Sequence, residues 1–400
     1  AEGDMQTAKI VSAFVGGALL VATLPAVAQT IRIGIVNSYS GALAQPGDEL
    51  DKGLSIYAKL HTKDLPPGVK VEIIRRDDTS SSPDVGKRVA QELIVREHVQ
   101  FLGGVIASPI ALAIAPLTAE AKVPFVDMNA SAVALPRLSP YVVRVSFTQW
   151  QTAYPLGKWV AQQGWKVAYS AVSDFNPGWD AEAAFKKGIV DGGGSLTSVR
   201  FPFVNPDFSP FVQRIADAHP NVAFIWVPAG TQATTMVKEI HNAKLMEHGT
   251  KIVATQDLLP DEELPNMGAN AVGIISAGTY SATATRPANV AFVAAWKKEY
   301  GANSTPDVYA VGGWDGMAAI FDTIKQTGGK FTADQAMAVL SHWTDPNSPR
   351  GPISIDPATR EIVQNIYIRR AEMKNGKLVN TEFYTIPNVT DPWKEFNPPK

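Results

Sequence analysis

Few residues of this chain could support catalysis or metal binding, and their spacing suits neither. His241 and His248 are the only two of the six His residues that lie near one another. Their spacing of seven puts them about two turns apart on a helix, which does not suit a metal site. Asp77 and Asp78 follow a predicted strand, where adjacent side chains face opposite sides of a sheet. A capping or hydrogen-bonding role therefore suits this pair better than acid–base catalysis.

Sequence motifs for the common catalytic chemistries are also missing. The chain has no Cys, which excludes a disulfide, a thiolate zinc site, an iron–sulfur cluster and a cysteine nucleophile. It contains no G-x-S-x-G, P-loop or H-E-x-x-H motif, and no G-x-G-x-x-G after a predicted strand. We therefore predict a protein that is not an enzyme and that uses no cofactor or metal ion. A small-amide or ester hydrolase is the weakest of the functions considered.

Length and composition favour a globular protein of two domains. The chain has 400 residues, of which 45% are hydrophobic and 18% are charged, and this is enough apolar material for two cores. Its formal net charge of -2 leaves no excess of Lys and Arg to neutralise phosphates. We predict that it binds neither nucleic acid nor an anionic membrane surface.

The N-terminal residues have the pattern of a secretory signal peptide. Lys9 is followed by an apolar run over 10–24 and then by the small-residue triplet at 26–28. A membrane anchor is disfavoured, because the run is shorter than a bilayer span and is interrupted by Gly. We predict that residues 1–28 are cleaved after Ala28 and that the mature protein resides in a bacterial periplasm.

Short β-branched runs alternate with amphipathic stretches after this segment, which predicts α/β lobes with parallel sheets. In the first part we expect strands at 31–36, 70–75, 99–102, 124–126 and 141–145, and helices at 49–61, 82–97 and 109–121. The rhythm restarts with helices at 150–163, 179–191, 208–218 and 231–243, and strands at 166–170, 195–201, 222–227, 251–255 and 272–276. Then come helices at 288–300, 308–327 and 332–344, hairpin strands at 353–355 and 365–370, and a Pro-rich surface tail after 387. Two doubly wound sheets suit this order better than one.

Three stretches carry a resemblance to a known family. They are IRIGIVNSYSGALAQPG from residue 31, RRDDTSSSPDVGKRVAQELIVREHVQFLGG from residue 75 and IASPIALAIAPLTAEAKVPFVDMNAS from residue 106. In order and spacing they resemble the branched-chain amino-acid (Leu/Ile/Val-type) periplasmic binding proteins of ABC transporters, and the likeness extends over most of the chain. The resemblance implies the type I periplasmic binding protein fold, with two doubly wound parallel-sheet lobes, a three-strand hinge and a ligand cleft between the lobes.

The resemblance also implies how the chain divides. We expect one lobe from residues 29–146 plus 279–348, and a second lobe from 147–278 plus 349–386. Residues 387–400 are expected to form a C-terminal tail.

Ser108, Asn129 and Ser131 match positions where the family holds a ligand carboxylate. Ser108 starts a predicted helix and can offer both its hydroxyl and its backbone N–H, while Asn129 and Ser131 follow the next strand. Helix N-termini suit an anion, because their N–H groups are free and the helix dipole is positive there. Helix or turn capping is the alternative role for all three residues.

The second lobe departs from the family pattern. Where the family places an aromatic residue before a glycine, this chain has Pro177, so Trp179 or Phe175 is expected to take over as a wall of the site. Gly230 falls where the family has a further aromatic contact. Gln256 matches the acid that holds an amino-acid ammonium group, and a neutral amide cannot supply that ion pair. A shift of one residue would place Asp257 there instead, and both alignments remain open.

Several other side chains are candidates for the cleft. Tyr39 and Trp150 are candidate aromatic lining residues, together with Tyr280, Tyr309 and Trp314, although a core position is the commoner role for each of these side chains. Arg144 lies on the first expected hinge strand, where it either pairs with a ligand carboxylate or locks the hinge.

Together these observations predict a monomeric solute-binding protein that delivers a small carboxylate to an ABC-transporter permease. An aromatic or hydrophobic acid suits the site best if Gln256 faces it. A branched-chain amino acid is the alternative if Asp257 does. A ligand-sensing regulatory module is a further alternative, although the sequence contains no output domain.

Overall fold

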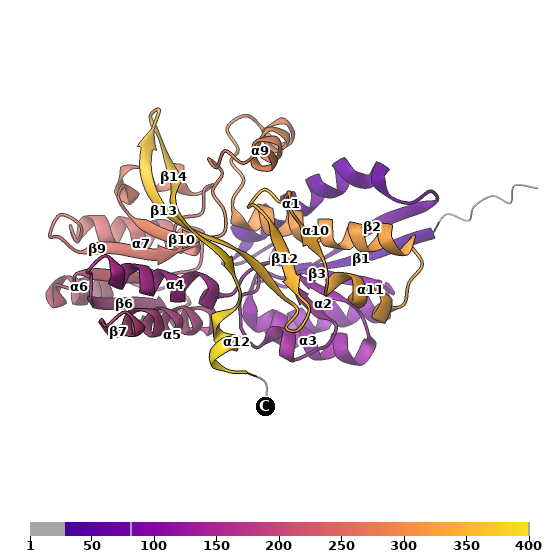
Figure 1. The fold of residues 1–400 in the computed structure, drawn as a ribbon, viewed down its shortest axis with the longest axis horizontal. Helices are drawn as coiled ribbons and strands as arrows, with labels where there is room; N and C mark the ends of the chain where they lie inside the picture. Colours follow the sequence, from indigo (N-terminus) through magenta and orange to yellow (C-terminus); the bar gives the residue numbers. More distant parts are fainter. Residues whose placement is uncertain (1–28, 81, 399–400) are drawn as a thin grey trace, which may run out of the picture.

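The computed structural model describes residues 29–80 and 82–398, which form two α/β lobes lying side by side (Figure 1). The predicted signal peptide, residues 1–28, falls outside this described part of the chain. Within it, no helix combines the length and the apolar character that a membrane crossing requires.

The first lobe is built on a parallel sheet of five strands in the order β2-β1-β3-β4-β5. The strands are β1 (Gln29–Asn37), β2 (Val69–Asp77), β3 (Phe101–Gly104), β4 (Phe125–Asp127) and β5 (Val142–Arg144). Ile33 of β1 is opposite Phe101 of β3, and both side chains are fully buried, as expected for a sheet covered on both faces. Helices of this lobe are α1 (Ala44–His61), α2 (Pro83–Val95), α3 (Ser108–Ala121), α9 (Pro287–Tyr300), α10 (Val308–Thr327) and α11 (Ala333–Leu340).

The second sheet has nine strands in the order β11-β12-β13-β10-β9-β8-β6-β7, with β14 paired to β13. Its strands are β6 (Val167–Ser173), β7 (Ser195–Phe201), β8 (Val222–Trp226), β9 (Lys251–Thr255), β10 (Ile275–Gly278), β11 (Thr344–Asp345), β12 (Ile353–Asp356), β13 (Glu361–Lys374) and β14 (Lys377–Val389). Strands β6 to β10 are parallel, whereas β13 runs antiparallel to β10. The remaining helices are α4 (Gln149–Gln162), α5 (Asn176–Asp191), α6 (Ser209–Ala218), α7 (Thr231–Asn242), α8 (Leu264–Met267) and α12 (Pro392–Phe396).

Glycines let α1 and α10 pack almost backbone to backbone. A β-carbon at Gly53 of α1 would lie 1.9 Å from the carbonyl oxygen of Ala310, and one at Gly313 of α10 would lie 2.1 Å from that of Leu50. No real side chain fits at such distances. This close packing fixes the first turn of α10, which carries Tyr309, beside the cleft-facing start of α1.

The chain passes between the two lobes three times. The first crossing is the segment 145–148 between β5 and α4, and the second is 279–286 between β10 and α9. The third is β13, because Ile362 packs in the core of the first lobe whereas Ile366 packs in a core of the second. Three adjacent crossings form a hinge about which the lobes can close on each other.

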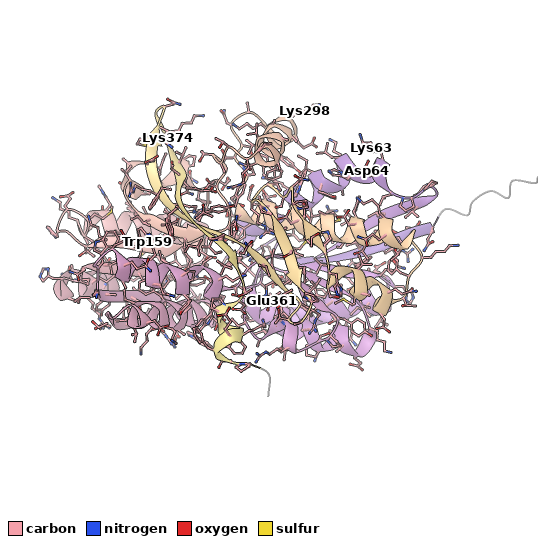
Figure 2. All side chains as sticks on the ribbon, viewed as in Figure 1. Lys63, Asp64, Trp159, Lys298, Glu361 and Lys374 are labelled. Carbon is pink, nitrogen blue, oxygen red and sulfur yellow. The ribbon has the colours of Figure 1, made fainter. Side chains whose placement is uncertain are left out.

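Arg144 is buried at this hinge and does not reach the pocket described below. Its Nε donates to Glu361 Oε2 at 2.7 Å, and its Nη1 lies 3.5 Å from Asp127 Oδ2. Figure 2 shows Glu361 at the junction of the lobes. Burial raises the pKa of Asp127 to about 7 although Arg144 opposes this shift. Of the two roles considered for Arg144, the contacts support fixing the hinge.

The C-terminal part differs from the sequence expectation. The short strand expected at 365–370 is part of a long hairpin of β13 and β14, and α12 follows it, lying below the junction of the lobes (Figure 1). Charged residues near the tip of this hairpin interrupt the alternation of apolar and polar residues from which a strand is predicted. The Asn375-Gly376 pair is the signal that was overlooked, because both residues have positive φ, 51° and 75°, as a two-residue hairpin turn requires.

Candidate functional site

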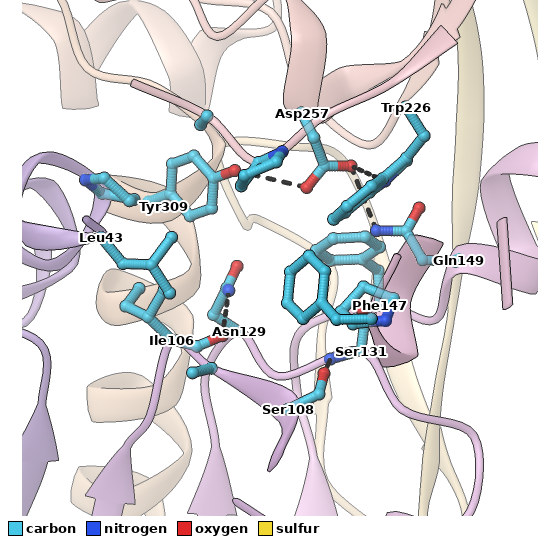
Figure 3. A pocket seen from close by; sticks show the side chains of 16 residues that line it. Leu43, Ile106, Ser108, Asn129, Ser131, Phe147, Gln149, Trp226, Asp257 and Tyr309 are labelled. Atoms are coloured by element: carbon cyan, nitrogen blue, oxygen red, sulfur yellow. Dashed lines mark hydrogen bonds between the residues drawn. The ribbon is translucent and has the colours of Figure 1, made fainter. Parts of the chain in front are cut away.

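A pocket lies where the two lobes meet, and both lobes contribute to its walls (Figure 3). Its lining residues come from the ends of strands and the first turns of helices, as is usual for ligand sites in parallel α/β sheets. They are Leu43, Pro46, Ile106, Ala107, Ser108, Asn129, Ser131, Phe147, Gln149, Phe175, Pro177, Trp226, Pro228, Ala229, Asp257 and Tyr309.

Ser108, at the first turn of α3, marks one polar end of the pocket. Its Oγ accepts hydrogen bonds from the backbone N–H groups of Ser131 at 3.0 Å and Ala132 at 3.1 Å. Because Oγ is an acceptor in both bonds, its own proton is free to be donated to a ligand. The backbone N–H of Ser108 also has no acceptor within the helix. It is the one free N–H of this turn, because Pro109 has no N–H and the N–H of Ile110 donates to the carbonyl oxygen of Ala107 at 3.1 Å. This end of the pocket therefore presents uncharged donors of the kind that hold a carboxylate.

Asn129 lies beside Ser108 in an orientation fixed by a hydrogen bond. Its Nδ2 donates to the carbonyl oxygen of Ile106 at 3.0 Å. The amide oxygen, Oδ1, is consequently turned into the pocket, as Figure 3 shows. The side chain of Asn129 thus offers an acceptor, and its backbone N–H donates to Asp127 Oδ1 at 3.4 Å.

Asp257 marks the opposite polar end (Figure 3). Its Oδ2 accepts from Thr255 Oγ1 at 2.7 Å, Gln149 Nε2 at 3.1 Å and Trp226 Nε1 at 3.2 Å. Its Oδ1 accepts from the hydroxyl of Tyr309 at 3.3 Å. Burial raises the pKa of Asp257, and the donors around Oδ2 act against that shift.

Local structure accounts for this arrangement. Asp257 follows the carboxyl end of β9 by two residues, on a short 3-10 turn. Thr148 starts α4 with a capping box, so that Gln149 sits in the first turn. Asp307 caps α10 by accepting a hydrogen bond from the backbone N–H of Tyr309 at 2.9 Å, which holds Tyr309 at the N-terminus of that helix.

Apolar and aromatic side chains separate the two polar ends. Leu43 and Ile106 come from the first lobe, Phe147 from the first crossing, and Phe175 and Trp226 from the second lobe. The rings of Phe175 and Trp226 are 5.4 Å apart between centroids. The lining includes one charged side chain, the acid described above, and no Lys or Arg. Such a site suits a flat apolar ligand with polar groups at its two ends.

The structure brings six of the sequence-predicted site candidates together in the pocket: Ser108, Asn129, Ser131, Phe175, Asp257 and Tyr309. It also decides between Gln256 and Asp257. The Oε1 of Gln256 accepts from the backbone N–H of Thr279 at 2.8 Å, so this side chain ties two strand ends together outside the lining. Of the two alignments left open, the pocket favours Asp257, because the 3-10 turn after β9 directs this side chain inward.

The other candidates lie elsewhere, for identifiable reasons. Trp179 is 40% exposed and its Nε1 donates to Asp174 at 2.7 Å. The Tyr39 hydroxyl donates to Asp51 at 2.6 Å. Trp150 packs in a core of the second lobe.

Gly230 precedes α7 with a φ of 95° and follows the lining residue Ala229 without lining the pocket itself.

Several lining residues were not predicted from sequence. Phe147 and Gln149 immediately follow the strand expected at 141–145, and their place in a hinge crossing is the signal that could have identified them. Trp226 is the last residue of β8, at the carboxyl end where ligands bind. Leu43 precedes α1, which the sequence pattern started five residues too late.

Comparison with known proteins gives one consistent assignment. The model of the family described as periplasmic binding protein matches residues 30–377. The Leu/Ile/Val-binding protein homolog 6 of Brucella melitensis is 36% identical over 371 residues, which are 92% of this chain and 94% of the relative.

Two solved structures of Rhodopseudomonas palustris solute-binding proteins of ABC transporters are also similar. One, from strain BisB5 in complex with 3,4-dihydroxybenzoic acid, is 42% identical with a TM-score of 0.87, covering 91% of this chain and 99% of that one. The other, in complex with 4-hydroxybenzoate, is 38% identical with a TM-score of 0.86, covering 91% and 98%.

The chain belongs to the periplasmic binding protein family, within its Leu/Ile/Val-binding branch. The family resemblance and the type I fold inferred from sequence are thereby confirmed. Members of this family bind solutes for transport, and membership implies a periplasmic location.

Proposed function

We propose that this protein is exported through its N-terminal signal peptide and captures a benzoate-class aromatic carboxylate for delivery to an ABC-transporter permease. The observation that carries the proposal is the pocket between the lobes. It has flat apolar walls, and at one end it has hydroxyl and backbone donors without a cationic side chain. The ligands in the two R. palustris relatives support the choice of an aromatic acid.

Capture by lobe closure accounts for the distribution of the lining residues. The carboxylate would bind first to the first lobe, at the hydroxyl and the backbone N–H of Ser108 at the start of α3. Phe175 and Trp226 of the second lobe would then cover the ring and stabilise the closed form. The permease would recognise the paired outer faces of the closed lobes. No step changes a covalent bond of the ligand, so the protein acts as a carrier.

A branched-chain amino acid is a second candidate ligand, and one observation favours it. Asp257 faces the pocket, and a carboxylate is what an ammonium group would need. The name of the Brucella relative points in the same direction. The wide aromatic walls favour the benzoate class, because a short aliphatic side chain would leave much of the Phe175 and Trp226 surface without a partner.

Isothermal titration calorimetry on the purified protein distinguishes the candidates. We expect heat of binding for benzoate and its ring-substituted forms and none for Leu, Ile or Val. Binding of the aliphatic amino acids alone would refute the proposal and support the second candidate. Size-exclusion chromatography with and without ligand tests the accompanying proposal that the carrier is a monomer.

A further inference from the structure

The pocket has two polar ends of different character, and Asp257 makes the difference. The Ser108 end offers the hydroxyl and backbone N–H donors of Ser108 beside the acceptor oxygen of Asn129, whereas the other end presents the acceptor-only oxygens of a carboxylate. Apolar side chains lie between them (Figure 3). A ligand whose carboxylate binds at the Ser108 end must therefore have either a hydrogen-bond donor or an apolar group at the Asp257 end.

The hydrogen bonds around Asp257 determine how many donors it can still accept. A carboxylate has about four lone-pair sites. Three protein donors crowd Oδ2, and Oδ1 holds a single long bond, the 3.3 Å contact with Tyr309. Oδ1 is the oxygen turned toward the pocket in Figure 3. One acceptor site on Oδ1 consequently remains for a ligand.

A single remaining site suits a hydroxyl group better than an ammonium group. A ring hydroxyl has one proton to donate, and one bond to Oδ1 satisfies it. An ammonium has three protons and loses a large hydration energy on burial, so it needs several acceptors around it. Gln149, Trp226 and Thr255 direct donors at Asp257, so Oδ1 is the carboxylate oxygen left at this end. The acceptor oxygen of Asn129 lies toward the other end of the pocket, beside Ser108.

We propose that Asp257 is the specificity-determining residue for a hydroxyl group on the ring of the ligand, and this inference rests on the proposed function. The ring hydroxyl donates a hydrogen bond to Asp257 Oδ1. The site is then selective for hydroxylated benzoates over benzoate itself. A benzoate without this group leaves the buried Oδ1 short of a donor, which costs about 10- to 100-fold in affinity for a charged acceptor.

Wild-type protein alone provides the first test. Titration calorimetry compares 4-hydroxybenzoate with benzoate and with 4-fluorobenzoate, which is similar in shape but has no proton to donate. We expect 4-hydroxybenzoate to bind about 10- to 100-fold more tightly than either. Equal binding of the three would overturn the role of Asp257 while leaving the proposed function intact. Failure of all three to bind would refute the proposed function.

Asp257→Asn provides the second test, with Asp174→Asn as a matched control. Asp174 is half-exposed in the same lobe and bonds Trp179 outside the pocket. We expect D257N to lose the preference for 4-hydroxybenzoate over benzoate, measured as the ratio of the two Kd values, whereas D174N keeps it. A preference that survives in D257N would overturn the proposal, as would leucine binding that D257N abolishes. The wild-type comparison decides the matter if D257N does not fold.

Discussion

The hydroxyl of Ser108 has two roles in this structure. As an acceptor it ties the start of α3 to the loop after β4 through the N–H groups of Ser131 and Ala132. As a donor it is free to meet a ligand. Because none of the described residues that line the pocket is Lys or Arg, much of the affinity for a carboxylate depends on this hydroxyl and on the backbone N–H of Ser108.

Substitution of Ser108 by Ala is therefore expected to weaken benzoate binding about tenfold or more, through loss of a hydrogen bond to a charged group. Calorimetric Kd values for wild type and S108A measure the effect. Ser341→Ala is the control, because Ser341 follows the last residue of α11, away from the pocket, and its Oγ donates to the carbonyl oxygen of Met337 in that helix. Unchanged affinity in S108A would mean that the carboxylate is held elsewhere.

Sequence reasoning located the donor end of the pocket better than the acceptor end. Ser108, Asn129 and Ser131 follow strand ends, and strand ends are visible in the hydrophobic pattern. The choice between Gln256 and Asp257 depends on the geometry of one 3-10 turn after β9, which no periodicity reveals. Trp179 and Phe175 were equally plausible, and the helix start at Asn176 turns Phe175 inward.

At the scale of elements, the short helix α12 joins the two lobes. Arg137 of the first lobe stacks on Trp393 at 4.5 Å, and Phe396 packs 5.3 Å from Tyr154 of α4 in the second lobe. Lys394 bonds both Glu361 and Asp391 and is almost buried. The C-terminal helix thus forms part of the hinge.

We expect Lys394→Met to lower the free energy of unfolding by about 3 kcal/mol, because it leaves the buried Asp391 without its cation, whereas Glu361 keeps Arg144. Urea denaturation followed by tryptophan fluorescence measures the change. Lys377→Met at the tip of the β13–β14 hairpin serves as the control, because Lys377 is exposed. A loss no greater than that of K377M would show that α12 is dispensable for stability.

The elements that sequence reasoning predicted and those that it missed differ in their hydrophobic pattern. The buried strands of both parallel sheets are apolar runs such as β8, and they were recognised. In β14 the apolar and polar residues alternate irregularly, and much of the strand is exposed. The strand is formed through its hydrogen bonds to β13, which its own hydrophobic pattern does not predict. α12 is too short for any helical period to appear.

At the scale of the whole molecule, acidic groups from both lobes meet across the cleft. Gln45 of α1 donates to Glu262 of the second lobe at 2.7 Å. Glu49, one turn further along α1, is buried and pairs with Lys52 at 3.0 Å. Burial raises the pKa of Glu49 to about 7, with a further contribution from Glu262, whereas Lys52 opposes the shift. Asp307, at the start of α10, interacts with Glu49 and also has a raised pKa.

The sign of the pH dependence follows from this shift. The raised pKa means that the folded protein binds the Glu49 proton more tightly than the unfolded chain does, so stability falls as pH rises from about 4.5 to 7. We expect Glu49→Gln to raise the melting temperature at about pH 8 relative to wild type and to change it little at about pH 5. Asp48→Asn is the control, because Asp48 is exposed and also pairs with Lys52. Parallel pH profiles for wild type and E49Q would contradict the expectation.

The order of the pocket residues along the chain affects how ligand specificity can change by genetic recombination. The donor end, Ser108 to Ser131, is encoded before the first hinge crossing, and the acceptor end, Gln149 to Asp257, is encoded after it. A single genetic crossover between codons 132 and 146 would therefore join an unchanged carboxylate-holding half to a half that recognises a different ring substituent. Within a gene family, new substrate ranges can arise by such exchanges in one event, without any loss of the shared anchoring group.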